Sequence, residues 1–263
     1  MKKILSILLA ILITASLYGC GSPADTPSTA PSEQSGASGN NQQEKSEDVS
    51  QEPAPNQTEI EETAYEITYS SAKVYTNSIG TVWSQVIVEI ENTGSSDLYL
   101  SSGAYDLEDT NGNLITSESM VSTYPEVISP GEKAYMYNET TLDDAIEGDV
   151  VVVPRPSVDK AKVENIRYSV TDVNISDGQY GDLKALGRIE NTSSEDSSMT
   201  YIVIIMKDSA GTPIGQMFTI LTDDLKAGDK IGFEMSAFAL PDDIKADSVA
   251  DFVAYAYPMQ MQF

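Results

Sequence analysis

The sequence predicts an all-β protein in which two antiparallel β-sandwiches follow one another along the chain. Three observations lead to this fold class. Short segments that alternate between apolar and polar residues begin at Tyr65, no stretch shows the period of an amphipathic helix, and a set of turn residues recurs 99 positions later. The residues before Tyr65 differ in composition and are expected to lie outside the folded part.

The clearest strand is the segment 82–90. Val86 and Val88 lie on one face of this segment, and Gln85 and Glu89 lie on the other. Such alternation is typical of an antiparallel strand that is buried on one side.

Two apolar runs, 150–153 and 249–257, predict further strands. The first is expected to end at Pro154, because proline has no N–H group to donate to a neighbouring strand. The segments 142–146 and 240–244 allow one helical turn each and no longer helix.

An internal repeat is the strongest signal of domain organisation. Ile90-Glu-Asn-Thr93 recurs as Ile189-Glu-Asn-Thr192, and the same offset of 99 relates further turn residues: Asp109 to Asp208 and Gly112 to Gly211. A unit of this length is too long for a solenoid repeat and has the size of one β-sandwich domain. We therefore predict one sandwich over residues 63–155 and a second over residues 160–263.

The N-terminus has the features of a secretory signal peptide, which we place at residues 1–19. Lys2 and Lys3 precede the apolar run 4–13, and small residues follow it. This run is shorter than the roughly 18 residues that a membrane-spanning helix needs. The alternative is a signal anchor that is retained.

The tetrapeptide Leu17-Tyr18-Gly19-Cys20 resembles the lipobox of bacterial lipoproteins, although Tyr18 is bulkier than the residue usual at its position. The resemblance implies cleavage before Cys20 and attachment of lipid to its thiol. Cys20 is the only cysteine, so no intramolecular disulfide can form. Stable attachment needs more than one acyl chain, and a diacylglyceryl cysteine supplies two.

The segment 20–62, which begins with this cysteine, is rich in Ser, Pro, Gln, Gly and Glu. Such a segment cannot bury enough apolar surface to offset its ordering entropy, so we predict a disordered linker. Its r.m.s. reach is roughly 35 Å, which is enough to hold folded domains away from a membrane.

Each repeat also resembles the FxLYD domain, an immunoglobulin-like module of exported proteins. The first copy has Tyr105-Asp-Leu-Glu-Asp109 at the position of the family motif, and the second has Ile204-Ile-Met-Lys-Asp208, in which only the Asp is literal. The resemblance implies two tandem immunoglobulin-like sandwiches and no particular activity.

The repeated residues have structural roles that follow from their chemistry. Tyr105 and Leu107 share one face of a strand, as do Ile204 and Met206, which places all four in a core. The repeated Asp residues are expected to accept bonds from backbone N–H groups two residues on. The repeated Gly residues are expected to supply a positive φ, and the Asn-Thr pairs to stabilise the other corner.

Composition excludes most catalytic chemistry. The chain has no histidine, which removes Ser-His, Cys-His and His-metal sites. A carboxylate pair remains, but no spacing among the 41 acidic residues selects one. The net charge of −26 argues against nucleic acid as a partner. We expect no enzyme and no cofactor.

Calcium is the one metal that the sequence suggests. Acidic residues cluster near the end of each copy, and carboxylate oxygens are the ligands that Ca²⁺ prefers. The weak candidates are Asp143, Asp144, Glu147 and Asp149, with a counterpart at Asp242, Asp243, Asp247 and Asp251.

These observations favour a non-enzymatic binding or scaffolding lipoprotein, lipid-anchored on the extracytoplasmic face of the cell membrane. Its expected partner is an envelope protein or glycan. Two alternatives stay open: a calcium-responsive structural module, and a substrate-binding accessory lipoprotein of a transporter.

Overall fold

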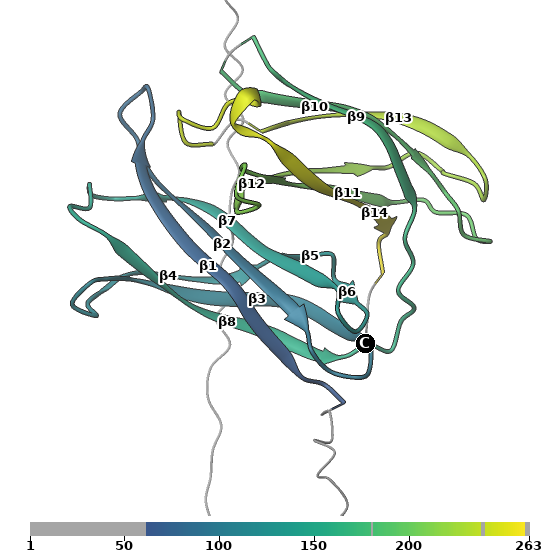
Figure 1. Ribbon diagram of the computed structural model, residues 1–263, viewed down its shortest axis with the longest axis horizontal. Coiled ribbons are helices and arrows are strands. Elements are labelled where there is room, and N and C mark those ends of the chain that lie inside the picture. The colour runs from purple at the N-terminus through teal and green to yellow at the C-terminus, as the bar shows by residue number, and fades with distance from the viewer. Residues whose placement is uncertain (1–61, 180, 238–239, 261–263) are drawn as a thin grey trace, which may run out of the picture. The chain divides into compact units, whose positions relative to one another are not determined.

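Strands form almost all of the regular structure (Figure 1). The computed structural model describes residues 62–179, 181–237 and 240–260. All strand pairs in this part of the chain are antiparallel, which confirms the predicted all-β fold class. No helix in these ranges is long and apolar enough to cross a membrane.

The first sandwich is built from two sheets that enclose one hydrophobic core. One sheet has the order β1-β2-β7-β5, and the other has the order β4-β3-β6, with β8 also paired to β3. The strands are β1 (Tyr65–Thr76), β2 (Val82–Asn92), β3 (Leu98–Asp109), β4 (Leu114–Val121), β5 (Thr123–Tyr124), β6 (Val127–Ile128), β7 (Lys133–Leu142) and β8 (Val150–Lys160).

The second sandwich repeats this plan around its own core. Its sheets have the orders β13-β10-β9 and β12-β11-β14. The elements are β9 (Ser169–Asp177), β10 (Leu183–Glu190), β11 (Thr200–Lys207), β12 (Pro213–Leu221), β13 (Lys230–Ala237), the short 3₁₀ helix η1 (Ala246–Ser248) and β14 (Asp251–Pro258).

The repeat in the sequence is therefore a repeat in structure. The sheet β1-β2-β7 corresponds to β9-β10-β13, and β4-β3-β8 corresponds to β12-β11-β14. The four predicted core residues, Tyr105, Leu107, Ile204 and Met206, are each 0% exposed. This confirms their assignment to the cores.

One local prediction was wrong. The strand that was expected to end at Pro154 continues through it and through Pro156 as part of β8. Prolines are tolerated there because β8 pairs with β3 alone, and an edge strand has N–H groups that need no partner strand. The segments 142–146 and 240–244 form bends and turns, and the short helix η1 follows the second of them.

A further difference is that β2 is buried on both faces. Val86 and Val88 lie in the core of the first sandwich, as the alternation predicts. However, Ile87, Gln85 and Glu89 on the opposite face are only 3%, 4% and 6% exposed. The strand is thus covered from both sides.

The cover is the second sandwich, since the described residues of both sandwiches belong to one compact unit. Tyr135 on β7 shares a buried cluster with Val203 and Ile205 on β11 and with Tyr257 on β14. This cluster joins the outer face of β1-β2-β7-β5 to the outer face of β12-β11-β14. We call it the inter-sandwich interface.

Aromatic rings surround this interface. Tyr124 on β5 stacks on Phe218 of β12 with ring centroids 4.8 Å apart, and Tyr201 meets Tyr257 edge-on at 5.6 Å. Such pairs contribute about 0.5–1.5 kcal/mol each beyond the area they bury. The interface is therefore held by packing of the kind found inside a domain.

The repeat explains why the interface forms between these two faces. The positions that correspond to Ile205 and Ile87 by the 99-residue offset are Asp106 and Leu186. Asp106 forms an ion pair with Arg155, and Leu186 is 48% exposed. Each copy thus buries only one of its two outer faces against the other copy.

Candidate functional site

The chain turns at an equivalent corner in each copy, and we call residues 92–97 the first corner and residues 191–196 the second corner. In the first corner the side chain of Asn92 is 1% exposed. Its Nδ2 donates to the carbonyls of Ser96 (2.9 Å) and Ile128 (3.0 Å), and its Oδ1 accepts from the N–H of Gly94 (3.0 Å). One amide thus satisfies two acceptors and one donor.

Asn191 repeats these bonds in the second corner. Its Nδ2 donates to the carbonyls of Glu195 (2.7 Å) and Leu225 (3.1 Å), and its Oδ1 accepts from the N–H of Ser193 (3.0 Å). The predicted stabilising role of the Asn-Thr pairs is therefore confirmed for the Asn of each pair.

The repeated Asp residues act in the same way at the next turn. The Oδ1 atom of Asp109 accepts from the N–H groups of Asn111 (2.8 Å) and Asn113 (2.9 Å). Together with a bond from the Asn113 side chain, these bonds lower the pKa of Asp109 to about 2. Asp208 accepts equivalent backbone bonds at 2.8 and 2.9 Å. The motif residues therefore form the turns, as predicted, and do not gather into a site.

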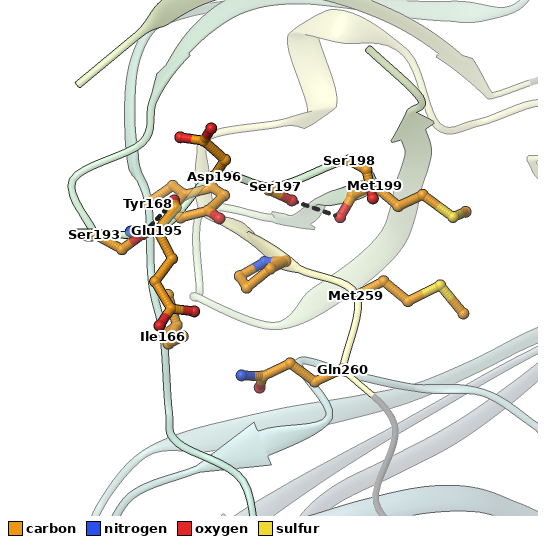
Figure 2. A pocket seen from close by; sticks show the side chains of 11 residues that line it. Ile166, Tyr168, Ser193, Glu195, Asp196, Ser197, Ser198, Met199, Met259 and Gln260 are labelled. Carbon is orange, nitrogen blue, oxygen red and sulfur yellow. Dashed lines mark hydrogen bonds between the residues drawn. The ribbon is translucent and has the colours of Figure 1, made fainter. Parts of the chain in front are cut away.

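The candidate site is a groove beside the second corner, with a volume of about 350 Å³ (Figure 2). In Figure 2 the sulfur atoms of Met199 and Met259 lie on one side of it and Glu195 lies on the other. The groove is lined by the start of the second copy, by the second corner and by the end of β14: Ile166, Tyr168, Ser193, Glu195, Asp196, Ser197, Ser198, Met199, Pro258, Met259 and Gln260.

The polar groups of the groove differ in how strongly they are already engaged. Ser197 is 5% exposed, and its hydroxyl donates to the carbonyl of Met199 at 2.9 Å. Asp196 accepts from the N–H of Ala227 at 3.0 Å. Glu195 is exposed, and so is the neighbouring Ser198. The groove thus presents a carboxylate, a hydroxyl and two thioethers to a ligand, which suits binding.

Two carboxyl groups with a raised pKa lie near the inter-sandwich interface. Burial raises the pKa of Glu126 to about 7 and the pKa of Glu139 to about 6. Glu139 accepts a 2.5 Å bond from Tyr137, which in turn accepts from Gln85 at 3.0 Å. These groups belong to the packing of the two sandwiches, since each of them lies on the covered sheet or next to it.

The chain between the sandwiches is tied to the first of them. The guanidinium of Arg167 donates to the carbonyl of Val127 and lies 5.4 Å from the ring centroid of Tyr257. Asn165 donates to Ser129 Oγ (2.9 Å) and to Glu132 (2.8 Å). These contacts fix the path by which the chain enters the second sandwich.

The sequence-predicted site residues do not form a common centre. Cys20, the signal peptide and most of the linker lie outside the described residues. Asp143 and Asp144 line a small pocket of about 240 Å³ after β7, and Glu147 and Asp149 are exposed beyond it. Across the ranges that the structure describes, no three His, Cys, Asp or Glu side chains are placed to hold a metal ion.

Two counterpart acids of the second copy, Asp243 and Asp251, are engaged elsewhere. Asp243 forms an ion pair with Lys73 of β1 at 2.5 Å, which lowers its pKa. The carboxylate of Asp251 accepts from the N–H of Phe252 at 2.8 Å.

The groove could not be predicted from the sequence. Its walls come from three separate segments, and none of them carries a pattern that distinguishes it from an ordinary loop. A signal for the inter-sandwich interface was present in the unbroken apolar run 201–206, because a strand buried on both faces loses its alternation.

Comparison with known proteins does not place the chain in a family. No protein-family model matches the chain, and no curated protein matches it.

Proposed function

We propose that this protein is a lipoprotein that is anchored through Cys20 to the extracytoplasmic face of the cell membrane. It acts there as a non-enzymatic binding or scaffolding module for an envelope protein or glycan. The lipobox-like tetrapeptide and the polar linker support the anchor and the stalk. The net charge of −26 supports a partner other than nucleic acid.

The observation that carries the binding function is the packing of the two sandwiches. Tyr135, Val203 and Ile205 are at most 1% exposed at the inter-sandwich interface. This packing holds the two sandwiches together as one preformed body, and a groove stays open at the second corner. Preformed surfaces bind with a smaller entropy cost than flexible ones.

The same architecture favours this function over the two alternatives. A solute-binding protein of a transporter is expected to have two lobes of mixed helix and sheet, whereas the described residues are all-β. A calcium-responsive module needs several oxygen ligands around one point, and the acids that the structure describes are dispersed.

The anchor is tested by expressing the full chain in a bacterial host and determining the mass of its mature N-terminus. We expect a chain that begins at an acylated Cys20. Cys20→Ser should lose the acyl mass, whereas Ser22→Ala, two residues further on, should keep it. An unacylated N-terminus in the wild-type chain would contradict the anchor.

The binding function is tested by cross-linking intact cells that display the full chain. We expect a defined envelope protein or glycan to be joined to it, and the same adduct should be absent from cells that lack the chain. If cross-linking recovers only the chain itself, even when the chain has reached its maximum level in the membrane fraction, the binding function is contradicted.

A further inference from the structure

The first corner is filled by the protein's own chain. The N–H groups of Thr93 and Gly94 donate to the carbonyl of Ala64 at 3.1 and 2.9 Å. The N–H of Ser96 donates to the carbonyl of Glu62 at 3.1 Å. Residues 62–64 thus lie along the corner and are bound through their backbone, as a peptide is bound when it extends a sheet.

A side chain adds charge recognition to this contact. The carboxylate of Glu62 accepts a 3.1 Å bond from Ser96 Oγ and pairs with Lys160 at the end of β8. Both partners lower the pKa of Glu62. Beside this pair, the N–H of Ala161 donates to the carbonyl of Asp97 at 2.9 Å. The first corner is therefore closed from two sides.

Among the described residues, none covers the second corner at the corresponding place. Tyr65 pairs with Asn92 in the first copy, and Ser169 pairs with Glu190 in the second, so Arg167 takes the position of Ala64. Among the described residues, only the Thr192 hydroxyl donates a hydrogen bond to the carbonyl of Arg167, at 3.1 Å.

The path of the chain explains this difference. Just before Arg167 the chain bends, with the N–H of Ile166 bonded to the carbonyl of Glu164 at 3.0 Å. The bend brings Arg167 and Asn165 onto the first sandwich, where they bond to Val127 and Glu132. The segment that would cover the second corner is thus used to join the sandwiches, and the groove of about 350 Å³ lies beside that corner.

We propose that this groove binds an extended peptide that carries a Lys or Arg side chain, in the way that the first corner holds residues 62–64. The proposal deepens the binding function proposed above and rests on it. The N–H of Glu195, which corresponds to that of Ser96, donates only a 3.3 Å bond to Ser193 within its own loop. A ligand carbonyl can replace so long a bond at little cost.

The charge of the ligand follows from one substitution between the copies. Ser96, which donates to the carboxylate of Glu62, is replaced by Glu195 in the second corner. A carboxylate there repels an acidic side chain and attracts a basic one. The ligand residue at the position of Glu62 is therefore expected to be a cation.

The apolar side of the groove suits the stem of such a cation. Met199 and Met259 are 36% and 38% exposed, whereas Leu100, which corresponds to Met199, is 1% exposed in the filled corner. Methionine adapts its shape to a ligand. A lysine or arginine can lay its methylene stem along the two thioethers while its charged end reaches Glu195.

The test measures binding of hexapeptides to the full chain by fluorescence anisotropy. The reference peptide has the sequence of residues 60–65, Ile-Glu-Glu-Thr-Ala-Tyr, and two others carry Glu62→Lys and Glu62→Gln. We expect affinity to fall in the order Lys, Gln, Glu, with about tenfold between the first and last at low salt.

Two protein variants locate the site. Glu195→Lys should reverse the order of the peptides, whereas Glu147→Lys, an equal change at an exposed position after β7, should leave it unchanged. Because both positions are exposed, both variants should have the melting temperature of the wild type. A change in peptide affinity then reflects binding and not a loss of folding.

The proposal is overturned if none of the peptides binds up to about 1 mM, or if Glu195→Lys leaves their order unchanged. Neither result affects acylation of Cys20 or cross-linking to an envelope partner, so this proposal and the proposed function fail separately.

Discussion

Replacing Ile205 with alanine tests whether the outer faces of the sandwiches are packed together. Ile205 is 1% exposed, and its side chain lies among Tyr135, Val203 and Tyr257 rather than in the core of its own sandwich. Ile→Ala changes at buried sites cost about 2–5 kcal/mol, because they remove apolar contacts and leave a cavity. A cost near 3 kcal/mol would lower the melting temperature by about 6–12 °C for a body of this size.

The measurement is thermal unfolding followed by far-ultraviolet circular dichroism, with Leu186→Ala as the control. Leu186 is 48% exposed on the outer face of β10, so its replacement should change stability by less than about 0.5 kcal/mol. If Ile205→Ala has as small an effect as Leu186→Ala, the outer face of β11 is exposed in solution, which would contradict the packing of the two outer faces.

A harsher change at the same position tests the coupling between the sandwiches. Ile205→Asp would place a carboxylate in an apolar contact, which is strongly unfavourable without a partner. We expect the sheets to separate while each core stays folded. Fluorescence of Trp83, the only tryptophan and a residue of β2, should then report a different midpoint from circular dichroism, whereas the wild type should give one midpoint.

Three further predictions concern acids, a corner and calcium. The pKa of Glu126 is raised to about 7, so the folded state holds its proton more tightly than the unfolded state, and stability falls as pH rises from about 4.5 to 7. Glu126→Gln should therefore stabilise the protein by about 1–2 kcal/mol at pH 8, after allowance for solvent screening, and leave it unchanged near pH 4; equal effects at both pH values in denaturant titrations would contradict this. Asn191→Ala should cost about 2–3 kcal/mol in the same titrations, because it leaves the carbonyls of Glu195 and Leu225 without their donor, while the exposed Asn174→Ala should be neutral. Calcium at about 1 mM should not change the melting temperature, and a rise that Asp144→Asn abolishes would show that a site forms after all.

Much of the fold could be predicted because its determinants are local. Alternation with a period of two identifies which side of a strand faces a core, and it placed Tyr105 and Ile204 correctly. The turn residues were equally informative, since Asn92 and Asp109 make bonds within a few residues of themselves. Because the two copies share these patterns of strand and turn residues, they form two sandwiches with the same strand order.

The prediction at Pro154 failed because the effect of a proline depends on the neighbouring strands. A proline that would break a central strand is accepted in β8, which pairs with β3 alone. Whether a strand lies at an edge is a property of the whole sheet, and no residue in the run 150–153 encodes it.

The sequence by itself determined the strands, the residues of each core and the chemistry of the repeated corners, because those depend on neighbours along the chain. The tertiary structure decided which outer faces meet, since Tyr135 and Ile205 are far apart in sequence and share one buried cluster only when the sheets pack. It also decided that one corner is filled and the other lies beside an open groove. The two corners are nearly the same in sequence, but Ala64 lies along the first, whereas Arg167 leads the chain back to the first sandwich.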